Sequence, residues 1–225
     1  PVRLMYRFMY RLSAVLLLAG LSQQLDAQSS TLDSLVHAEV NASKPYIVAL
    51  RRHFHQHPEP GGQEKETVRR LKDELRQLGG FDICDVPAST GFYAILDTHR
   101  KGPTVGLRTD IDGLPISESP LNGGGQPKTL LSENDGISQG CGHDGHMAIL
   151  MGTARILRKM RDSLHGRFVF IFEEGEETNT GIRPMLKDLS EIHFDVIYGN
   201  HLSSYVPTGN IYVQEGPVMA SVRTA

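Results

Sequence analysis

The chain has 225 residues, a formal net charge of −3 at pH 7, and a composition that is 39% hydrophobic and 22% charged. This composition is typical of a folded globular protein, and the length suffices for about one domain or slightly more. A nearly neutral charge without a basic run argues against an electrostatic nucleic-acid surface, so we expect no nucleic-acid partner.

Residues 1–27 have the features of a secretory signal peptide. Arg3, Arg7 and Arg11 precede an apolar run from Leu12 to Leu21, and the small residue Ala27 follows. Such a run fits the core of a signal peptide but is shorter than the roughly 20 residues that span a bilayer. We expect cleavage after Ala27, an exported (periplasmic or secreted) protein, and no stable membrane insertion afterwards. The alternative is an interfacial anchor helix that stays attached.

The rest of the chain alternates predicted helices and strands. Helices are expected over 31–57, with a break near Pro45, over 67–78, where Gly79-Gly80 follows, and over 143–160 and 182–189. Short apolar runs predict strands over 81–86, 92–96, 104–107, 168–172, 196–198 and 210–213. This alternation predicts an α/β fold with a mainly parallel central sheet flanked by helices.

Polar residues follow three of these predicted strands. Asp110 and Asp112 come after 104–107, a glutamate run after 168–172, and His201 after 196–198. A fourth polar cluster opens the predicted helix 143–160. Ligand sites of open α/β sheets lie beyond the carboxyl ends of the strands. We therefore expect one site to contain Asp110, Cys141, His143, Glu176, Glu177 and His201.

These residue types together predict a metal centre. Cysteine, histidine and carboxylate side chains are ligands for zinc or a similar first-row ion. Burying them together without a cation would be costly. One of two adjacent glutamates can bind the metal while its neighbour acts as general base. The helix start behind Cys141 is expected to favour its thiolate form.

Each residue also has an ordinary structural interpretation. The run Glu173–Glu177 alone would fit a solvated acidic turn, His201 a structural histidine, and Asp110 and Asp112 turn caps. Their joint placement at successive strand ends favours the metal centre.

The remaining histidines and the second cysteine are expected to be structural. His53, His55 and His57 point in different directions on a helix, so they do not suit one shared ion. His146 lies three residues after His143, and a ligand role is the alternative interpretation for it. Cys84 lies in an apolar run and is expected in the core, with a disulfide to Cys141 as the alternative.

Six segments match the motifs of one known family, in family order. They are RRHFHQHPEPGGQE (51–64), VGLRTDIDGLPISE (105–118), GCGHDGHMAILMGTARIL (140–157), GRFVFIFEEGEE (166–177), GNHLSSYVPTG (199–209) and EGPVMAS (215–221). They resemble the M20 metallopeptidase clan, in particular its amidohydrolase branch of hippurate hydrolases, N-acyl-amino-acid deacylases and auxin-conjugate hydrolases.

The resemblance implies a role for each site residue. Glu176 resembles the general base that deprotonates the attacking water and then protonates the leaving amine. Asp110 resembles a carboxylate that orients the ligands. We therefore expect Asp110 and Glu176 to be the catalytic residues. Arg108 stands where other members of the clan place a metal-binding histidine. Two divalent ions are implied, zinc in the first place and manganese, cobalt or nickel as alternatives. The residues that look like their ligands are Cys141, His143, Glu177 and His201.

Three departures from the family pattern stand out. Gln139-Gly140 replaces His-Ala before the cysteine. Glu173-Glu174-Gly175 replaces Gln-Pro-Ala before the glutamate pair, which we expect to add negative charge near the metals. Family members are also much longer, because a lid-like domain interrupts their catalytic domain, which then supplies a further ligand histidine. We therefore expect residues 28–216 to be a partial catalytic domain and 217–225 to begin the missing lid or dimerisation domain.

The resemblance implies a metal-dependent amidohydrolase that cleaves N-acyl amino acids or small peptides. In the length given, the chain is expected to be weakly active or inactive, and a homodimer is expected only through the lid domain. The alternatives are a di- or tripeptidase or ureido hydrolase of the same clan, and a non-catalytic metal-binding fragment.

Overall fold

The computed structural model describes residues 32–178 and 181–216, and the chain divides into two compact units, residues 1–46 and 47–225. The expected signal peptide and the expected start of the lid domain lie outside the described residues, so both, together with export, stay predictions. Within the described ranges, no helix has the length and apolar character needed to cross a membrane.

In the first unit, residues 32–46 are helical, and Pro45 lies inside the helical segment. The predicted break near Pro45 is therefore wrong. A proline costs a helix one backbone hydrogen bond. In the second unit, residues 47–56 are also helical and bury Leu50 and Phe54, each 1% exposed. Burial of two large side chains offsets the lost hydrogen bond.

A five-stranded sheet in the order β1-β2-β4-β3-β5 forms the centre of the second unit. Its strands are β1 (Asp82–Asp85), β2 (Phe92–Asp97), β3 (Thr104–Asp110), β4 (Arg167–Glu173) and β5 (Val196–Gly199). β2 pairs antiparallel with β1 and β4, whereas β3 pairs parallel with β4 and β5. Among these strands, only β2 runs against the others, which confirms the expected mainly parallel α/β sheet.

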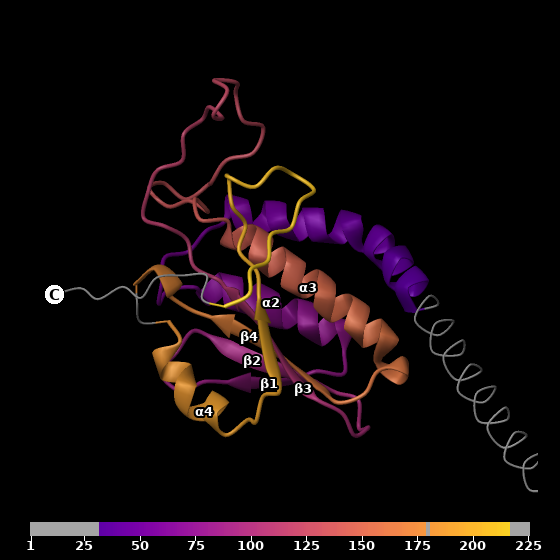
Figure 1. Cartoon of the computed structure of the whole chain (residues 1–225). Coiled ribbons are helices and arrows are strands. Elements are labelled where there is room, and N and C mark those ends of the chain that lie inside the picture. Colours follow the sequence, from indigo (N-terminus) through magenta and orange to yellow (C-terminus); the bar gives the residue numbers. More distant parts are fainter. Residues whose placement is uncertain (1–31, 179–180, 217–225) are drawn as a thin grey trace, which may run out of the picture. The chain divides into compact units, whose positions relative to one another are not determined.

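Helices cover both faces of this sheet (Figure 1). α2 (Lys65–Leu78) and α3 (His143–Met160) lie side by side on one face, and the short α4 (Leu186–Ser190) lies on the other. α2 ends as expected at Gly79, whose φ of 69° lies in the left-handed region that glycine favours. The predicted helix 182–189 is shorter than expected, because a 3₁₀ turn at Arg183–Met185 precedes α4.

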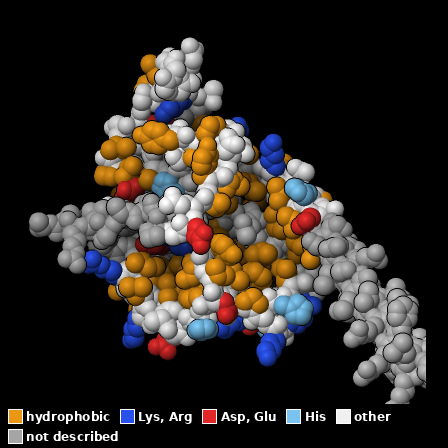
Figure 2. All heavy atoms as spheres, viewed as in Figure 1, with side chains coloured by type: hydrophobic (Ala, Val, Ile, Leu, Met, Phe, Trp, Pro, Cys, Tyr) orange, Lys and Arg blue, Asp and Glu red, His pale blue; other side chains and the backbone are white. Residues whose placement is uncertain are grey.

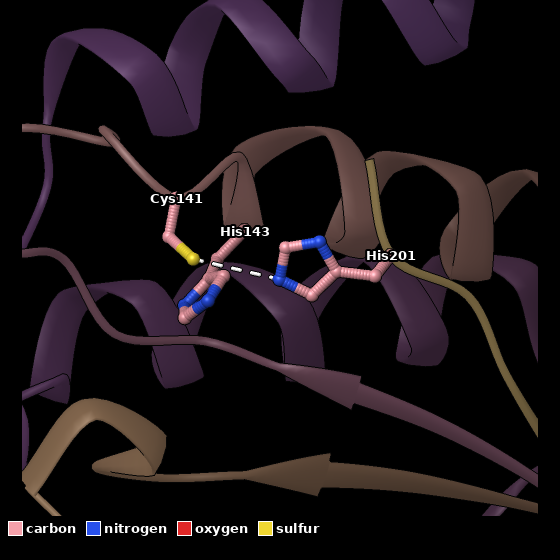
Figure 3. Close-up of side chains that lie close together, drawn as sticks. All are labelled: Cys141, His143 and His201. Atoms are coloured by element: carbon pink, nitrogen blue, oxygen red, sulfur yellow. Dashed lines mark hydrogen bonds between the residues drawn. The ribbon is translucent and has the colours of Figure 1, made fainter. Parts of the chain in front are cut away.

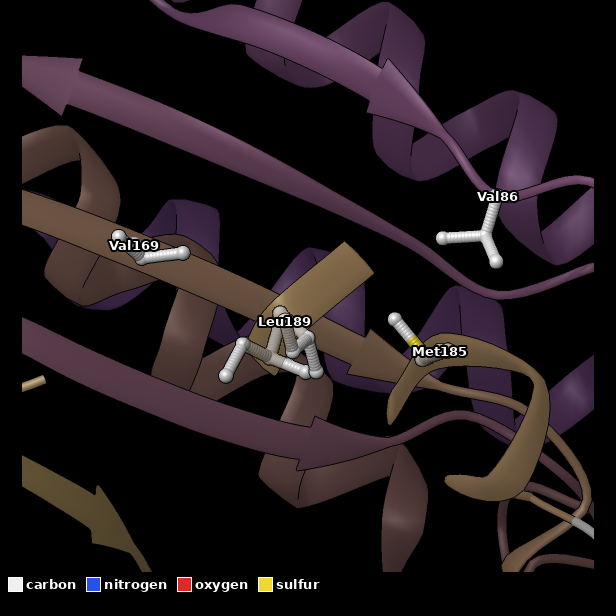
Figure 4. Close-up of a cluster of buried hydrophobic side chains, with 5 residues drawn as sticks. Val86, Val169, Met185 and Leu189 are labelled. Atoms are coloured by element: carbon white, nitrogen blue, oxygen red, sulfur yellow. The ribbon is translucent and has the colours of Figure 1, made fainter. Parts of the chain in front are cut away.

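Alternate residues of β4 pack on opposite faces of the sheet. On one face, Phe172 stacks on Phe92 with ring centroids 4.4 Å apart, and Lys72 of α2 lies over Phe92. On the other face, Val169 and Ile171 pack in a second apolar cluster (Figure 4). The remaining buried members of that cluster are Val86, Met185 and Leu189. The sheet is thus packed between two apolar layers.

β5 is an edge strand of the described sheet, and its apolar side chains are exposed. Ile197 and Tyr198 are 53% and 60% exposed. Apolar side chains also gather elsewhere on the face of the molecule that Figure 2 shows. An edge strand presents backbone N–H and C=O groups that can pair with a further strand.

Two further expectations differ from the structure. Residues 210–213 form no strand, and Ile211, Tyr212 and Val213 are 72–93% exposed. Strand propensity alone does not form a ladder without a partner strand, and the described residues provide none here. Cys84, expected in the core, is half-buried because β1 is the other edge strand. Cys84 and Cys141 are both free thiols, so the disulfide alternative is wrong.

Candidate metal centre

The carboxyl ends of β3, β4 and β5 lie together at one edge of the sheet. Asp110, the last residue of β3, pairs with Glu173, the last residue of β4. Arg108 of β3 pairs with Gly199, which ends β5. The start of α3 reaches the same edge, because His143 lies close to Asp110. The predicted convergence of strand ends and helix start is present.

Cys141, His143 and His201 point toward one another (Figure 3). The Sγ of Cys141 lies 3.5 Å from Nε2 of His201, and the donor atoms of all three residues lie within 4.8 Å of one another. His143 forms a second group with Glu176 and Glu177 under the same limit. The structure therefore brings the four predicted ligands and the predicted base to one place.

The Nε2 atom of His143 gives the clearest indication of a cation. His143 is 1% exposed, and Nε2 has no hydrogen-bond partner among the described residues. Carboxylate oxygens of Asp110, Glu177 and Glu176 lie 3.5, 3.7 and 3.9 Å from it. Across the ring, Nδ1 lies 2.9 Å from the carbonyl oxygen of Asp112. With the proton on Nδ1, the Nε2 lone pair faces carboxylates, which is favourable when a cation lies between them.

His201 is oriented in a similar way. Its Nδ1 lies 2.6 Å from the carbonyl oxygen of Leu202, and its Nε2 faces Cys141. The N–H of Leu202 donates to Nε2 of His146 at 2.8 Å, and Nδ1 of His146 donates to Asp110 at 2.7 Å. Both ring nitrogens of His146 are thus engaged. This favours the expected structural role over a ligand role, and His146 anchors the segment that carries His201.

Burial and neighbouring charges shift the pKa values of several groups in this cluster. Burial, aided by Glu177, raises the pKa of Cys141 to about 12. Burial also raises the pKa of Glu176, and the charge of Glu177 raises it further. Burial lowers the pKa of His143, but its hydrogen bond to Asp112 and the nearby carboxylates outweigh burial and raise it. The expected thiolate at Cys141 is therefore wrong for the metal-free site, because burial and carboxylates outweigh the helix dipole.

Metal binding is expected to release protons, because a thiolate and a neutral imidazole are the forms that coordinate. The apparent metal affinity should rise with pH, since the raised pKa values of Cys141 and His143 keep protons on the site at lower pH. Calorimetric titration with Zn²⁺ in buffers of different ionisation enthalpy should count about one proton or more per protein. Cys84→Ser, which removes the other thiol, should leave this count unchanged. A count of zero in the parent would contradict the prediction.

Asp110 is engaged through both carboxylate oxygens. Oδ1 accepts the hydrogen bond from His146, and Oδ2 accepts one from Nη1 of Arg108 at 2.9 Å. Burial alone would raise the pKa of Asp110, but the bond from His146 and the charges of His143 and Arg108 lower it. A carboxylate held in this way orients its neighbours, as the family resemblance implies.

The two additional glutamates before the pair are engaged with other partners. Glu173 accepts a hydrogen bond from Nε of Arg108 at 2.7 Å. Glu174 accepts hydrogen bonds from the backbone N–H and the hydroxyl of Thr90. Both additional carboxyl groups thus have partners of their own, and the expected increase of negative charge near the metals stays a prediction. A guanidinium offsets the charge of Glu173, and Glu174 belongs to a separate buried network.

The part that Asp112 plays at the site was not expected from the sequence. Asp112 is 1% exposed, and its Oδ2 accepts the N–H of Glu177 at 3.0 Å while Oδ1 contacts His143. One carboxylate therefore holds two of the predicted ligands. Alternation along an extended segment places Asp110 and Asp112 on the same side, and this signal was present in the sequence.

The histidines of the preceding helix hold other parts of the structure. His55 lies between Asp144, at 2.8 Å, and Glu118, at 3.1 Å. The expected structural role of His55 is confirmed. His53 and His57 lie edge to face with ring centroids 4.8 Å apart, and neither belongs to a metal-binding group of the described residues.

Comparison with known proteins gives consistent matches. The family model described as peptidase family M20/M25/M40 matches residues 106–221. The chain is 35% identical over 183 residues to an N-acyl-L-amino acid amidohydrolase of Geobacillus stearothermophilus, covering 81% of this chain and 48% of that protein. It is 37% identical over 177 residues to an N-acetylcysteine deacetylase of Bacillus subtilis, covering 78% of this chain and 45% of that protein.

A solved structure agrees with these matches. The crystal structure of the YXEP protein of Bacillus subtilis, described as a dinuclear metal binding peptidase from the M20 family, has a TM-score of 0.71 and 36% sequence identity. The match covers 79% of this chain and 48% of that one. The chain thus spans about half the length of the relatives that it matches.

Proposed function

Because the chain belongs to peptidase family M20/M25/M40, we propose that the full-length protein is a metal-dependent amidohydrolase that cleaves the amide bond of N-acyl amino acids. The observation that carries this proposal is the buried Nε2 of His143. It has no hydrogen-bond partner among the described residues and faces three carboxylates. The relatives described as an N-acyl-L-amino acid amidohydrolase and an N-acetylcysteine deacetylase support the substrate class.

The proposed site holds two divalent ions. The dinuclear metal-binding relative supports this number, and so does the membership of His143 in more than one donor group. Sulfur and nitrogen donors favour zinc, with manganese, cobalt or nickel as alternatives. Bound ions would supply Lewis-acid activation of the amide carbonyl and of the attacking water. The proposed ligands are Cys141, His143, Glu177 and His201.

The two glutamates of the turn have different surroundings, which supports different roles. The side chain of Glu176 is 40% exposed. The side chain of Glu177 is 26% exposed, and the backbone N–H of Glu177 donates to Asp112. We assign Glu176 the transfer of a proton from water to the leaving amine. Burial and the neighbouring Glu177 raise the pKa of Glu176, which makes its carboxylate a stronger proton acceptor.

The test is a substrate screen with protein expressed from the complete reading frame. We expect metal-dependent release of free amino acid from N-acetyl and N-benzoyl amino acids, and loss of activity after treatment with a chelator. Dipeptides and N-carbamoyl amino acids serve as the competing substrates. Hydrolysis of dipeptides alone would replace the proposal by a peptidase, and turnover of carbamoyl compounds alone by a ureido hydrolase. Metal binding without turnover of any substrate would favour a non-catalytic protein.

A further inference from the structure

Glu64 is a fully buried glutamate to which the proposed reaction assigns no role. It lies directly before α2 and is 0% exposed. Its Oε1 accepts the N–H of Gly175 at 2.7 Å, and its Oε2 lies 2.6 Å from the hydroxyl oxygen of Thr90. Glu64 and Gly175 are 111 positions apart. The hydrogen bond therefore joins the start of α2 to the turn that follows β4.

The turn that begins at Gly175 carries both Glu176 and Glu177. Two buried carboxyl groups hold its backbone, since Glu64 accepts the N–H of Gly175 and Asp112 accepts the N–H of Glu177. The turn is also closely packed, because a Cβ atom at Gly61 would come within 2.8 Å of the Cα of Gly175. Gly175 itself has a φ of 51°. The directions of the two glutamate side chains therefore depend on these two backbone contacts.

Thr90 links Glu64 to a second buried carboxyl group, that of Glu174. The hydroxyl oxygen of Thr90 lies within hydrogen-bonding distance of both carboxyl groups. A hydroxyl group has one proton, so it can donate to only one of them. The other contact requires a proton on a carboxyl group. Burial raises the pKa of Glu64, and the two carboxyl groups and the hydroxyl of Thr90 form one buried hydrogen-bonded bridge.

We propose that Glu64 is a positioning residue, which acts as the hydrogen-bond acceptor for Gly175 and thereby holds the turn of Glu176 and Glu177. The inference rests on the proposed function, because it assigns Glu64 an effect on the proposed base and ligand. It also gives a place to Glu174, which stands where the family pattern has proline. The Thr90 bridge that Glu174 completes is the partner that Glu64 needs in the protein interior.

Two variants of nearly equal length separate the acceptor from the packing. Glu64→Gln keeps an oxygen acceptor for Gly175 and a donor for Thr90, whereas Glu64→Met keeps only the length. In the full-length, zinc-loaded protein, we expect Glu64→Gln to retain kcat and metal affinity within about 3-fold. We expect Glu64→Met to lower kcat and metal affinity by about 10- to 100-fold each, with little change in KM, as is typical of residues that hold ligands in place.

The matched control is Glu74→Gln. Glu74 is a buried glutamate of α2, the helix that follows Glu64, but its partner is Arg70 of the same helix. We compare all variants in kcat, in thermal unfolding and in metal affinity, which is measured by competition with a chelator. Glu74→Gln should match the parent in metal affinity and kcat. If Glu64→Met does not fold, Thr90→Val is the second variant. It removes the bridging hydroxyl and should lower kcat by about 3- to 10-fold.

The outcomes distinguish this inference from the proposed function. If the parent binds metal and turns over substrate while Glu64→Met, or Thr90→Val in its place, behaves like the parent, the positioning role is overturned and the proposed function stands. An equal loss of kcat and metal affinity in Glu64→Gln and Glu64→Met also overturns the positioning role. The loss would then come from removing a negative charge and not from removing the oxygen acceptor. A parent without metal and turnover overturns both.

Discussion

Replacing Glu176 by glutamine is expected to lower kcat of the full-length protein by about 10²- to 10⁴-fold without loss of metal. The side chain of Glu176 is 40% exposed, and its Oε2 lies 3.9 Å from Nε2 of His143. It therefore lies beside the proposed ligands and remains accessible to a substrate. Glutamine keeps the size and polarity of the side chain but cannot take a proton from water and return it to the leaving amine. Turnover of an N-acetyl amino acid and metal analysis of the same sample measure both quantities.

Two further substitutions serve as controls for this prediction. Glu177→Gln should lose metal as well as activity, because Glu177 is the proposed ligand and the less exposed of the pair. Glu191→Gln, at an exposed glutamate that follows α4, should change neither. Loss of metal in Glu176→Gln, with retention in Glu177→Gln, would mean that the two roles are exchanged.

The place of the site was predictable because it depends mainly on chain direction. Asp110, Glu177 and His201 each follow an apolar run, and parallel strands bring their carboxyl ends to one edge. The start of α3 at His143 and the end of α2 at Gly79 were predictable from local residue preferences. These features require only the sequence near each residue, together with the rule that parallel strands share a direction.

The buried polar contacts that hold the site were not predictable. Glu64 and Gly175 are 111 positions apart, and Asp112 and Glu177 are 65 apart. A hydrogen bond between such residues leaves no periodic pattern in the sequence. The state of Cys141 was predicted wrongly for the same reason. The helix start is local, whereas the burial of Cys141 and the carboxylate of Glu177, which together raise the pKa of Cys141, depend on distant segments.

Cys141→Ser is expected to weaken metal binding by at least about 100-fold, the upper end of the range for residues that only support ligands. Cys141 lies with its Sγ 3.5 Å from Nε2 of His201, so sulfur is one of the converging donors. A serine hydroxyl fills almost the same space but stays protonated and is a poor ligand near neutral pH. Because Cys141 is only half-buried, we expect the fold to tolerate the change. Chelator competition and thermal unfolding measure these two effects.

Cobalt provides an independent measurement on the same variant. In the Co²⁺-loaded parent, a thiolate ligand gives a sulfur-to-metal charge-transfer band, which should be absent in Cys141→Ser and unchanged in Cys84→Ser. Cys84 is also a half-buried free thiol, but it belongs to β1, which pairs only with β2 in the described sheet, so it is a matched control. The serine variant should also release fewer protons on binding, because the thiol whose pKa is about 12 no longer has to ionise. A band that survives in Cys141→Ser would exclude the thiolate ligand, and His143, Glu177 and His201 would then have to hold the metal without it.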